Sequence, residues 1–107
     1  MYKNINKKEV LELKNLVKYQ EGQVVSKTLV QNELVSVTIF SFDKGEEIST
    51  HASGGDAMVT VREGKGKFTI GGDVFFLKEG QTIIMPKDVP HSVLGEEKFK
   101  MLLVVSF

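Results

Sequence analysis

The fold of this chain is decided by the stretch Gly45-Glu-Glu-Ile-Ser-Thr-His51-Ala-Ser-Gly-Gly-Asp-Ala-Met-Val-Thr-Val-Arg-Glu-Gly64. It places His51, the first of only two histidines, just before a Gly-Gly turn and a run of alternating apolar and polar residues. A second stretch, Met85-Pro-Lys-Asp-Val-Pro-His91, follows a similar run. Proline cannot donate to a sheet ladder, so we expect that strand to end at Met85 and a stiff loop to present His91. The two stretches therefore predict that both histidines meet inside a small β-barrel.

The composition narrows the function classes. The chain has 107 residues, which suits one domain, and its 14 basic and 14 acidic residues cancel. With no net positive charge, the sequence gives no sign of binding to nucleic acid or to an anionic membrane surface. The absence of cysteine excludes disulfides, thiolate metal sites and cysteine nucleophiles. The longest apolar run, residues 101–105, is too short to span a bilayer, and the N-terminus lacks the apolar core of a signal peptide. We expect a soluble, cytoplasmic protein.

One helix is predicted, over residues 7–17 of an N-terminal segment 1–22. Its apolar residues recur at spacings of three and four: Val10, Leu13, Leu16 and Val17. Asn6 followed by Glu9 fits an N-terminal capping arrangement, in which the Asn side chain accepts an unpaired amide proton. A helix this short is marginal alone, so we expect its apolar stripe to dock on the rest of the protein.

After residue 22 the apolar period changes to two. Residues 34–42 alternate, with Val35, Val37 and Ile39 on one face. Further β-rich runs follow at residues 57–63, 67–70, 74–77, 82–85 and 99–106. Gly71-Gly72 lies between two of them and predicts a tight hairpin, because such turns need positive φ. Many short strands with frequent turns predict an all-β sandwich or barrel over residues 23–107.

The two histidine stretches resemble the two motifs of the cupin superfamily. The first motif reads Gly, five residues, His-x-His, three or four residues, Glu, six residues, Gly; the matching positions here are Gly45, His51, Ser53, Ala57 and Gly64. The second reads Gly, five residues, Pro-x-Gly, two residues, His, three residues, Asn; the matching positions are Gly80, Pro86, Asp88, His91 and Gly95. The resemblance implies a cupin-type double-stranded β-helix, or jelly-roll barrel, with a short N-terminal helix, and one cupin domain over residues 1–107.

The resemblance also implies a metal site, because cupins typically hold a metal with three histidines and one glutamate. Carried across, His51 and His91 occupy ligand positions, whereas Ser53 replaces the second histidine and Ala57 replaces the glutamate. Serine is a poor ligand for transition metals and alanine is none. The expected metal is a weakly held zinc, nickel, iron, copper or manganese ion, since imidazole suits several of these.

Other residues are candidates for a third ligand or for the pocket wall. Asp56 neighbours the missing glutamate position and is either a carboxylate ligand or a turn-stabilising side chain. Met85 either lines the pocket for an apolar ligand or fills a gap in the core. Ser53 lies at a motif position, and the remaining acidic candidates near the motifs are Glu46, Glu47 and Asp88.

Three functions fit this sequence. The first is a protein that binds a small molecule in a pocket lined by His51 and His91. The second is a metal-dependent enzyme of the dioxygenase, isomerase or decarboxylase type that cupins include, or one that uses the imidazole pair as acid and base. The third is a non-catalytic structural or sensor domain. Residues 101–105 are apolar on both faces, so their outer face needs cover from the N-terminal segment or from a second subunit. The resemblance predicts a homodimer.

Overall fold

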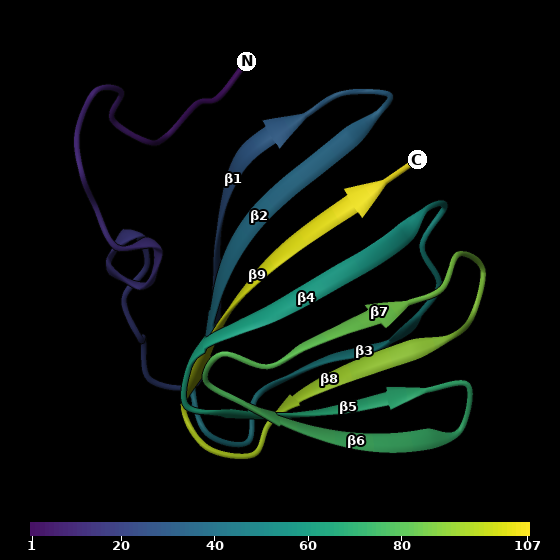
Figure 1. Ribbon diagram of the computed structural model, residues 1–107. Coiled ribbons are helices and arrows are strands. Elements are labelled where there is room, and N and C mark those ends of the chain that lie inside the picture. Colours follow the sequence, from purple (N-terminus) through teal and green to yellow (C-terminus); the bar gives the residue numbers. More distant parts are fainter.

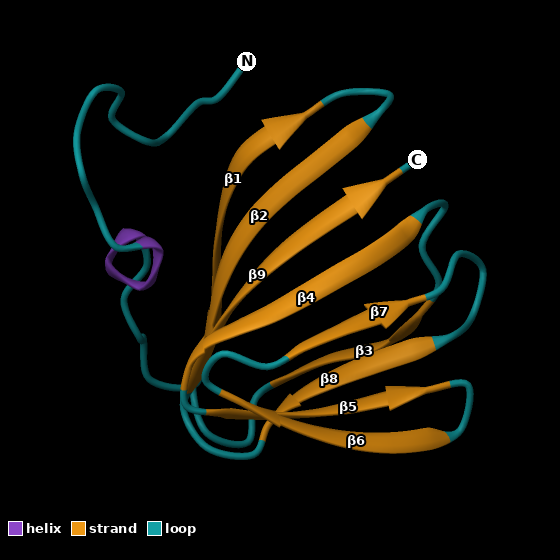
Figure 2. Cartoon of the chain, viewed as in Figure 1, coloured by secondary structure: helices purple, strands orange, loops and turns teal.

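A computed structural model describes residues 1–107 and shows two antiparallel β-sheets that face each other (Figure 1). The elements are η1, a 3-10 helix (Leu13–Leu16), and the strands β1 (Val24–Gln31), β2 (Val35–Phe42), β3 (Glu47–His51), β4 (Asp56–Glu63), β5 (Lys65–Ile70), β6 (Asp73–Lys78), β7 (Thr82–Met85), β8 (His91–Gly95) and β9 (Phe99–Ser106). Before β1 the chain is mostly loop (Figure 2). No helix has the length and apolar character needed to cross a membrane.

The strand order is that of a jelly roll. One sheet has the order β1-β2-β9-β4-β7 and the other has the order β3-β8-β5-β6, with every neighbouring pair antiparallel. From β2 to β9 the chain passes repeatedly from one sheet to the other, which confirms the predicted all-β fold class. The edge strands β1 and β7 do not pair with β3 or β6, so the barrel is open and consists of two stacked sheets.

The hairpin predicted at Gly71-Gly72 is present. It joins β5 to β6, and the two glycines have φ of 56° and 89°. A two-residue hairpin loop needs positive φ at these positions because its twist must match that of the strands, and glycine adopts such angles without steric cost.

The core lies between the sheets and is aromatic on the side away from the histidines. Phe42, Phe68 and Phe99 are fully buried. The rings of Phe42 and Phe99 stack with centroids 4.5 Å apart, and Phe68 meets Phe99 edge-on at 6.0 Å. None of the three lines the cavity described below, although other members of the same buried cluster do, such as Val93 and Met101.

The helix predicted over residues 7–17 is wrong, because only Leu13–Leu16 forms a single 3-10 turn. Lys8 has φ of 57°, which an α-helix cannot contain. Asn6 does not cap a helix but donates from Nδ2 to the Glu9 carboxylate at 2.9 Å. One apolar stripe on a short segment does not stabilise a helix in isolation, and here tertiary contacts with the sheet determine the backbone instead.

The N-terminal segment lies against the outer face of the larger sheet (Figure 1). η1 packs against β2, β4 and β9. Lys100 Nζ on β9 donates to the Lys14 carbonyl at 2.7 Å, and the Tyr19 hydroxyl donates to the Glu63 carboxylate at 2.6 Å. Burial, together with the Glu63 carboxylate, raises the pKa of Tyr19 well above its usual range, so this hydroxyl stays a donor. The sequence predicted that the apolar outer face of residues 101–105 is covered by the N-terminal segment or by a second subunit. In the structure, the N-terminal segment of the same chain packs on this strand.

Candidate functional site

The two histidines come from neighbouring strands of the smaller sheet. His51 ends β3, His91 begins β8, and the two strands pair antiparallel. Ile48 lies opposite Val93, but His51 lies opposite His91, so the register shifts by one residue between the two pairs. This β-bulge changes the face on which His51 lies, because neighbouring strand residues otherwise point to opposite faces. Ile48 and His51 therefore both line the cavity despite their odd separation.

The loop before His91 is held by hydrogen bonds to the loop after His51. Asp88, with φ of 63°, donates its amide to the Ser53 carbonyl at 2.9 Å. The Lys87 amide donates to the Asp56 carboxylate, also at 2.9 Å. The two histidine-bearing segments are thus hydrogen-bonded to each other beyond the end of the strand pair, and the strand before His91 ends at Met85 as predicted.

The two imidazole rings meet edge to face. Their Nε2 atoms are 3.2 Å apart, their centroids 4.4 Å apart, and their planes are inclined at 70°. The juxtaposition that the two motifs predicted is therefore present. His91 is only 2% exposed, whereas His51 is at the solvent side of the pair.

The other ring nitrogens both face backbone carbonyls. His51 Nδ1 lies 2.9 Å from the Ser49 carbonyl oxygen, and His91 Nδ1 lies 3.1 Å from that of Val89. A carbonyl oxygen can only accept, so each Nδ1 carries the proton and donates it. In the neutral rings both Nε2 atoms are consequently acceptors that point at each other.

A cavity of about 220 Å³ lies between the sheets beside this pair. Both sheets contribute to its wall, which is formed by Phe40, Ile48, His51, Ser53, Ala57, Met85, His91, Val93, Met101, Leu103 and Val105. The only polar side chains among them are those of the two histidines and Ser53. No lysine, arginine, aspartate or glutamate lines the cavity, and burial lowers the pKa of His91 below its usual value. The site is therefore an apolar chamber with one wall of neutral hydrogen-bonding groups.

The remaining sequence candidates divide into two groups. Ser53 lines the cavity and its Oγ accepts from the Gly55 amide at 3.3 Å, and Met85 also lines it while being 2% exposed. Asp56 does not line the cavity and instead accepts from the Lys87 amide, which is the turn-stabilising role. The three other acidic candidates, Glu46, Glu47 and Asp88, are likewise outside its wall.

The donor set does not fit a tightly held metal ion. His51 and His91 offer two Nε2 atoms, but the next two motif positions offer a serine hydroxyl and the methyl group of Ala57. No group of three or more histidine, cysteine, aspartate or glutamate side chains is arranged to hold an ion. Resident transition-metal sites normally use three or four protein ligands, so this one is short of at least one.

Sequence reasoning missed the apolar wall. Phe40, Ile48, Val93 and Leu103 lie on four different strands and were not among the site candidates. For Val93 a signal existed, because it is two residues from His91 on the same strand and so shares its face. For Ile48 the bulge removes that signal, and its place in the wall follows only from the strand pairing.

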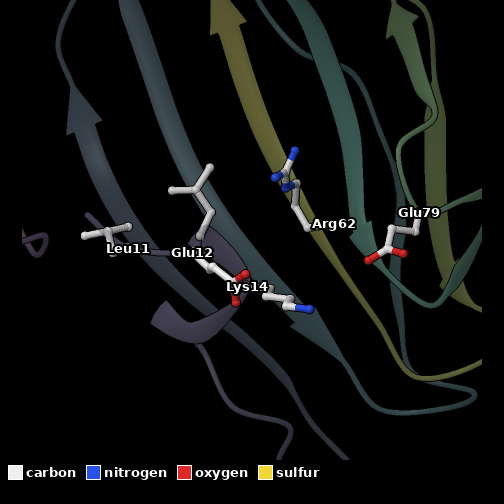
Figure 3. A pocket seen from close by; sticks show the side chains of 6 residues that line it. Leu11, Glu12, Lys14, Arg62 and Glu79 are labelled. Atoms are coloured by element: carbon white, nitrogen blue, oxygen red, sulfur yellow. The ribbon is translucent and has the colours of Figure 1, made fainter. Parts of the chain in front are cut away.

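A second, larger depression of about 420 Å³ lies outside the sheets, between the N-terminal segment and β4 (Figure 3). Its polar lining consists of Glu12, Lys14, Arg62 and Glu79, two bases and two acids. The charges cancel, and no chemistry-bearing pair like the two histidines is present there. The inter-sheet cavity is therefore the better candidate for a functional site despite its smaller volume.

Comparison with known proteins gives consistent results. A protein-family model described as a cupin domain matches residues 38–105. A crystal structure of a protein of unknown function from Streptococcus pyogenes is 45% identical, with a TM-score of 0.96 and coverage of 98% of this chain and 92% of that one. A cupin superfamily protein from Desulfitobacterium hafniense is 28% identical, with a TM-score of 0.95 and coverage of 100% and 98%. An uncharacterised protein from Aquifex aeolicus is 30% identical over 92% of this chain and 83% of its own length.

Proposed function

Because the chain belongs to the cupin domain family, we propose that it binds a small molecule in the cavity between its sheets, against His51 and His91. The observation that carries this proposal is the convergence of the chain's only two histidines on the wall of an otherwise apolar cavity. Apolar pockets with a few convergent polar groups are the usual form of small-molecule sites.

The size of the cavity limits the ligand. Its volume of about 220 Å³ is below the range of roughly 300–1,000 Å³ that is usual for drug-sized ligands. The ligand is accordingly a single ring or a short branched chain and not a sugar nucleotide or a polycyclic compound.

A divalent metal belongs to this proposal only in a weak form. Zinc, nickel, iron, copper or manganese would be held by the Nε2 atoms of His51 and His91, with no third strong protein ligand. We therefore infer no catalytic step through an ion. The alternative of a metal-dependent enzyme has less support than binding, and a purely structural domain would not need an unfilled cavity beside paired histidines.

The binding function is tested by filling the cavity. Ala57 is 1% exposed and lines the cavity, so A57L places a larger side chain inside it. We expect the affinity for benzene, followed through amide chemical shifts of residues in the cavity wall, to fall at least tenfold in this variant. A52L is the matched control, because Ala52 is exposed and outside the wall, and its affinity should equal that of the wild type. Equal benzene binding by A57L and the wild type, or none by either, would contradict the proposal.

A homodimer is a further part of the proposed function. Several large apolar side chains remain about half exposed on the edge strand β6 and on β7: Val74, Phe75, Phe76 and Ile84. Exposed large apolar side chains of this kind, of which the three on β6 are neighbours in sequence, are typical of protein contacts. We expect sedimentation at micromolar concentration to give twice the 11.9 kDa mass of one chain. A single species at the mass of one chain would refute the dimer.

A further inference from the structure

We propose that the cavity selects a neutral, mainly apolar ligand that carries a hydroxyl or N–H group, with phenol as the simplest example. This group donates its hydrogen to the Nε2 atoms of His51 and His91. The inference deepens the proposed function and rests on it, because it assigns a chemical class to the ligand of the same cavity.

The histidine pair has fewer hydrogens than its close contacts require. Three close contacts involve the two rings: His51 Nδ1 to the Ser49 carbonyl, His91 Nδ1 to the Val89 carbonyl, and Nε2 to Nε2. Each contact needs one hydrogen to be a hydrogen bond. Two neutral imidazoles carry one N–H each, and both carbonyl contacts require it on Nδ1. The neutral pair is therefore one hydrogen short at the Nε2 atoms.

The surroundings do not supply that hydrogen. None of the cavity-lining side chains from β2, β3, β4, β7, β8 or β9 is charged, so no carboxylate stabilises an imidazolium there. The acidic side chains near the histidines in sequence, Glu47, Asp56 and Asp88, are all outside the cavity wall, and Asp56 accepts from the Lys87 amide. Ser53 has a hydroxyl in the wall, but its Oγ accepts from the Gly55 amide and makes no hydrogen bond to either Nε2 atom. A donor from a bound ligand fills the gap without placing a charge in an apolar chamber, which would be costly.

The same reasoning excludes anionic ligands. A carboxylate only accepts hydrogen bonds, and in the neutral site it would face two acceptor nitrogens. No lysine or arginine lines the cavity to compensate its charge. The apolar side chains around the pair, including Phe40 and Leu103, instead suit the hydrocarbon part of the ligand. The geometry thus separates phenol from benzoate, although both fit by size.

Three probes of similar size test the selection on the full chain: phenol, fluorobenzene and benzoate. The protein is treated with a chelator and titrated at pH 8, above the usual histidine pKa of about 6.5 and below the phenol hydroxyl value of about 10. We expect phenol to bind about tenfold more tightly than fluorobenzene, which corresponds to about 1.4 kcal/mol, and benzoate not to bind measurably. Fluorobenzene is the matched probe because it has nearly the shape of phenol and lacks the donor.

Two variants and a spectroscopic measurement test whether the preference for phenol depends on His51 and His91. H51F and H91F each remove one of the two acceptors and keep an apolar ring, so each should weaken the preference for phenol while fluorobenzene still binds. H51F serves if H91F does not fold, since His51 is the more exposed ring. Imidazole ¹⁵N shifts of the ligand-free wild type at pH 8 should show the Nδ1–H tautomer in both rings.

The outcomes separate this inference from the proposed function. Equal affinities for phenol and fluorobenzene would overturn the donor selection and leave cavity binding intact. Binding of none of the three probes would contradict the proposed function itself. A preference for phenol that is present only before chelator treatment would assign the hydroxyl to a metal ion and overturn the direct bond to the histidines.

Discussion

Replacing Phe99 by alanine is expected to lower the free energy of unfolding by about 3–5 kcal/mol. Phe99 is fully buried, stacks on Phe42 at 4.5 Å and meets Phe68 at 6.0 Å. Its neighbours leave little room to collapse, since a Cβ added to Gly66 would lie 2.8 Å from the Phe99 ring. The loss combines the transfer energy of the ring with the cavity that remains. Urea denaturation followed by circular dichroism measures it.

Phe107 provides the control for this experiment. It is 55% exposed at the end of the chain, so F107A should change the free energy of unfolding by no more than about 0.5 kcal/mol. A loss below about 1 kcal/mol for F99A would mean that the aromatic cluster is not the main core.

Gly64→Ala is expected to be destabilising by about 2–5 kcal/mol, for two reasons that add. Gly64 connects β4 to β5 with φ of 75°, which costs an L-residue roughly 1–2 kcal/mol. In addition, an added Cβ would collide with the Lys98 carbonyl oxygen and lie 2.8 Å from the Cα of Phe99. Both contacts are to backbone, so relief requires a shift of the strand that begins at Phe99, at roughly 1–3 kcal/mol more. Urea denaturation again gives the value.

The variant G72A measures the conformational cost of positive φ without the steric cost that G64A adds. The φ of 89° at Gly72 is similarly positive, but an added Cβ would have nothing within 4 Å. G72A should therefore cost only the conformational part, about 1–2 kcal/mol. If G64A and G72A proved equally destabilising, the close approach of Gly64 to the neighbouring strand would not matter energetically.

The motif glycines explain why the fold could be predicted from so few residues. Gly45, Gly64 and Gly80 all have positive φ, as expected for turn residues in the two histidine stretches. This requirement is local, because it depends on the backbone angles of one residue. The two-residue hairpin at Gly71-Gly72 and the alternating strands follow from equally local rules. The N-terminal helix was predicted wrongly because its conformation depends on docking to the sheet and not on its own periodicity.

The candidate site could be predicted only in part. The motif spacing brought His51 and His91 together, and it placed Ser53 and Ala57 beside them in the wall. The motif spacing did not decide whether the Asp56 side chain stabilises a turn or binds a metal ion. The structure resolves that point because the Asp56 carboxylate accepts from the Lys87 amide, which is far from it in sequence.

The sequence by itself determined an all-β sandwich or barrel and its turns, because strand period and glycine φ are properties of short segments. The resemblance of its two motifs to those of cupins implied the jelly-roll architecture and the two facing histidines. Tertiary structure alone decided what the histidines face. The bulge between Ile48 and His51 sets the face of one ring, and four strands beyond β3 and β8 complete the wall. The carbonyls of Ser49 and Val89 face the two Nδ1 atoms and favour the Nδ1–H tautomer in both rings. These features depend on the register between distant segments, and a slip of one residue would turn the side chains of a strand to its other face.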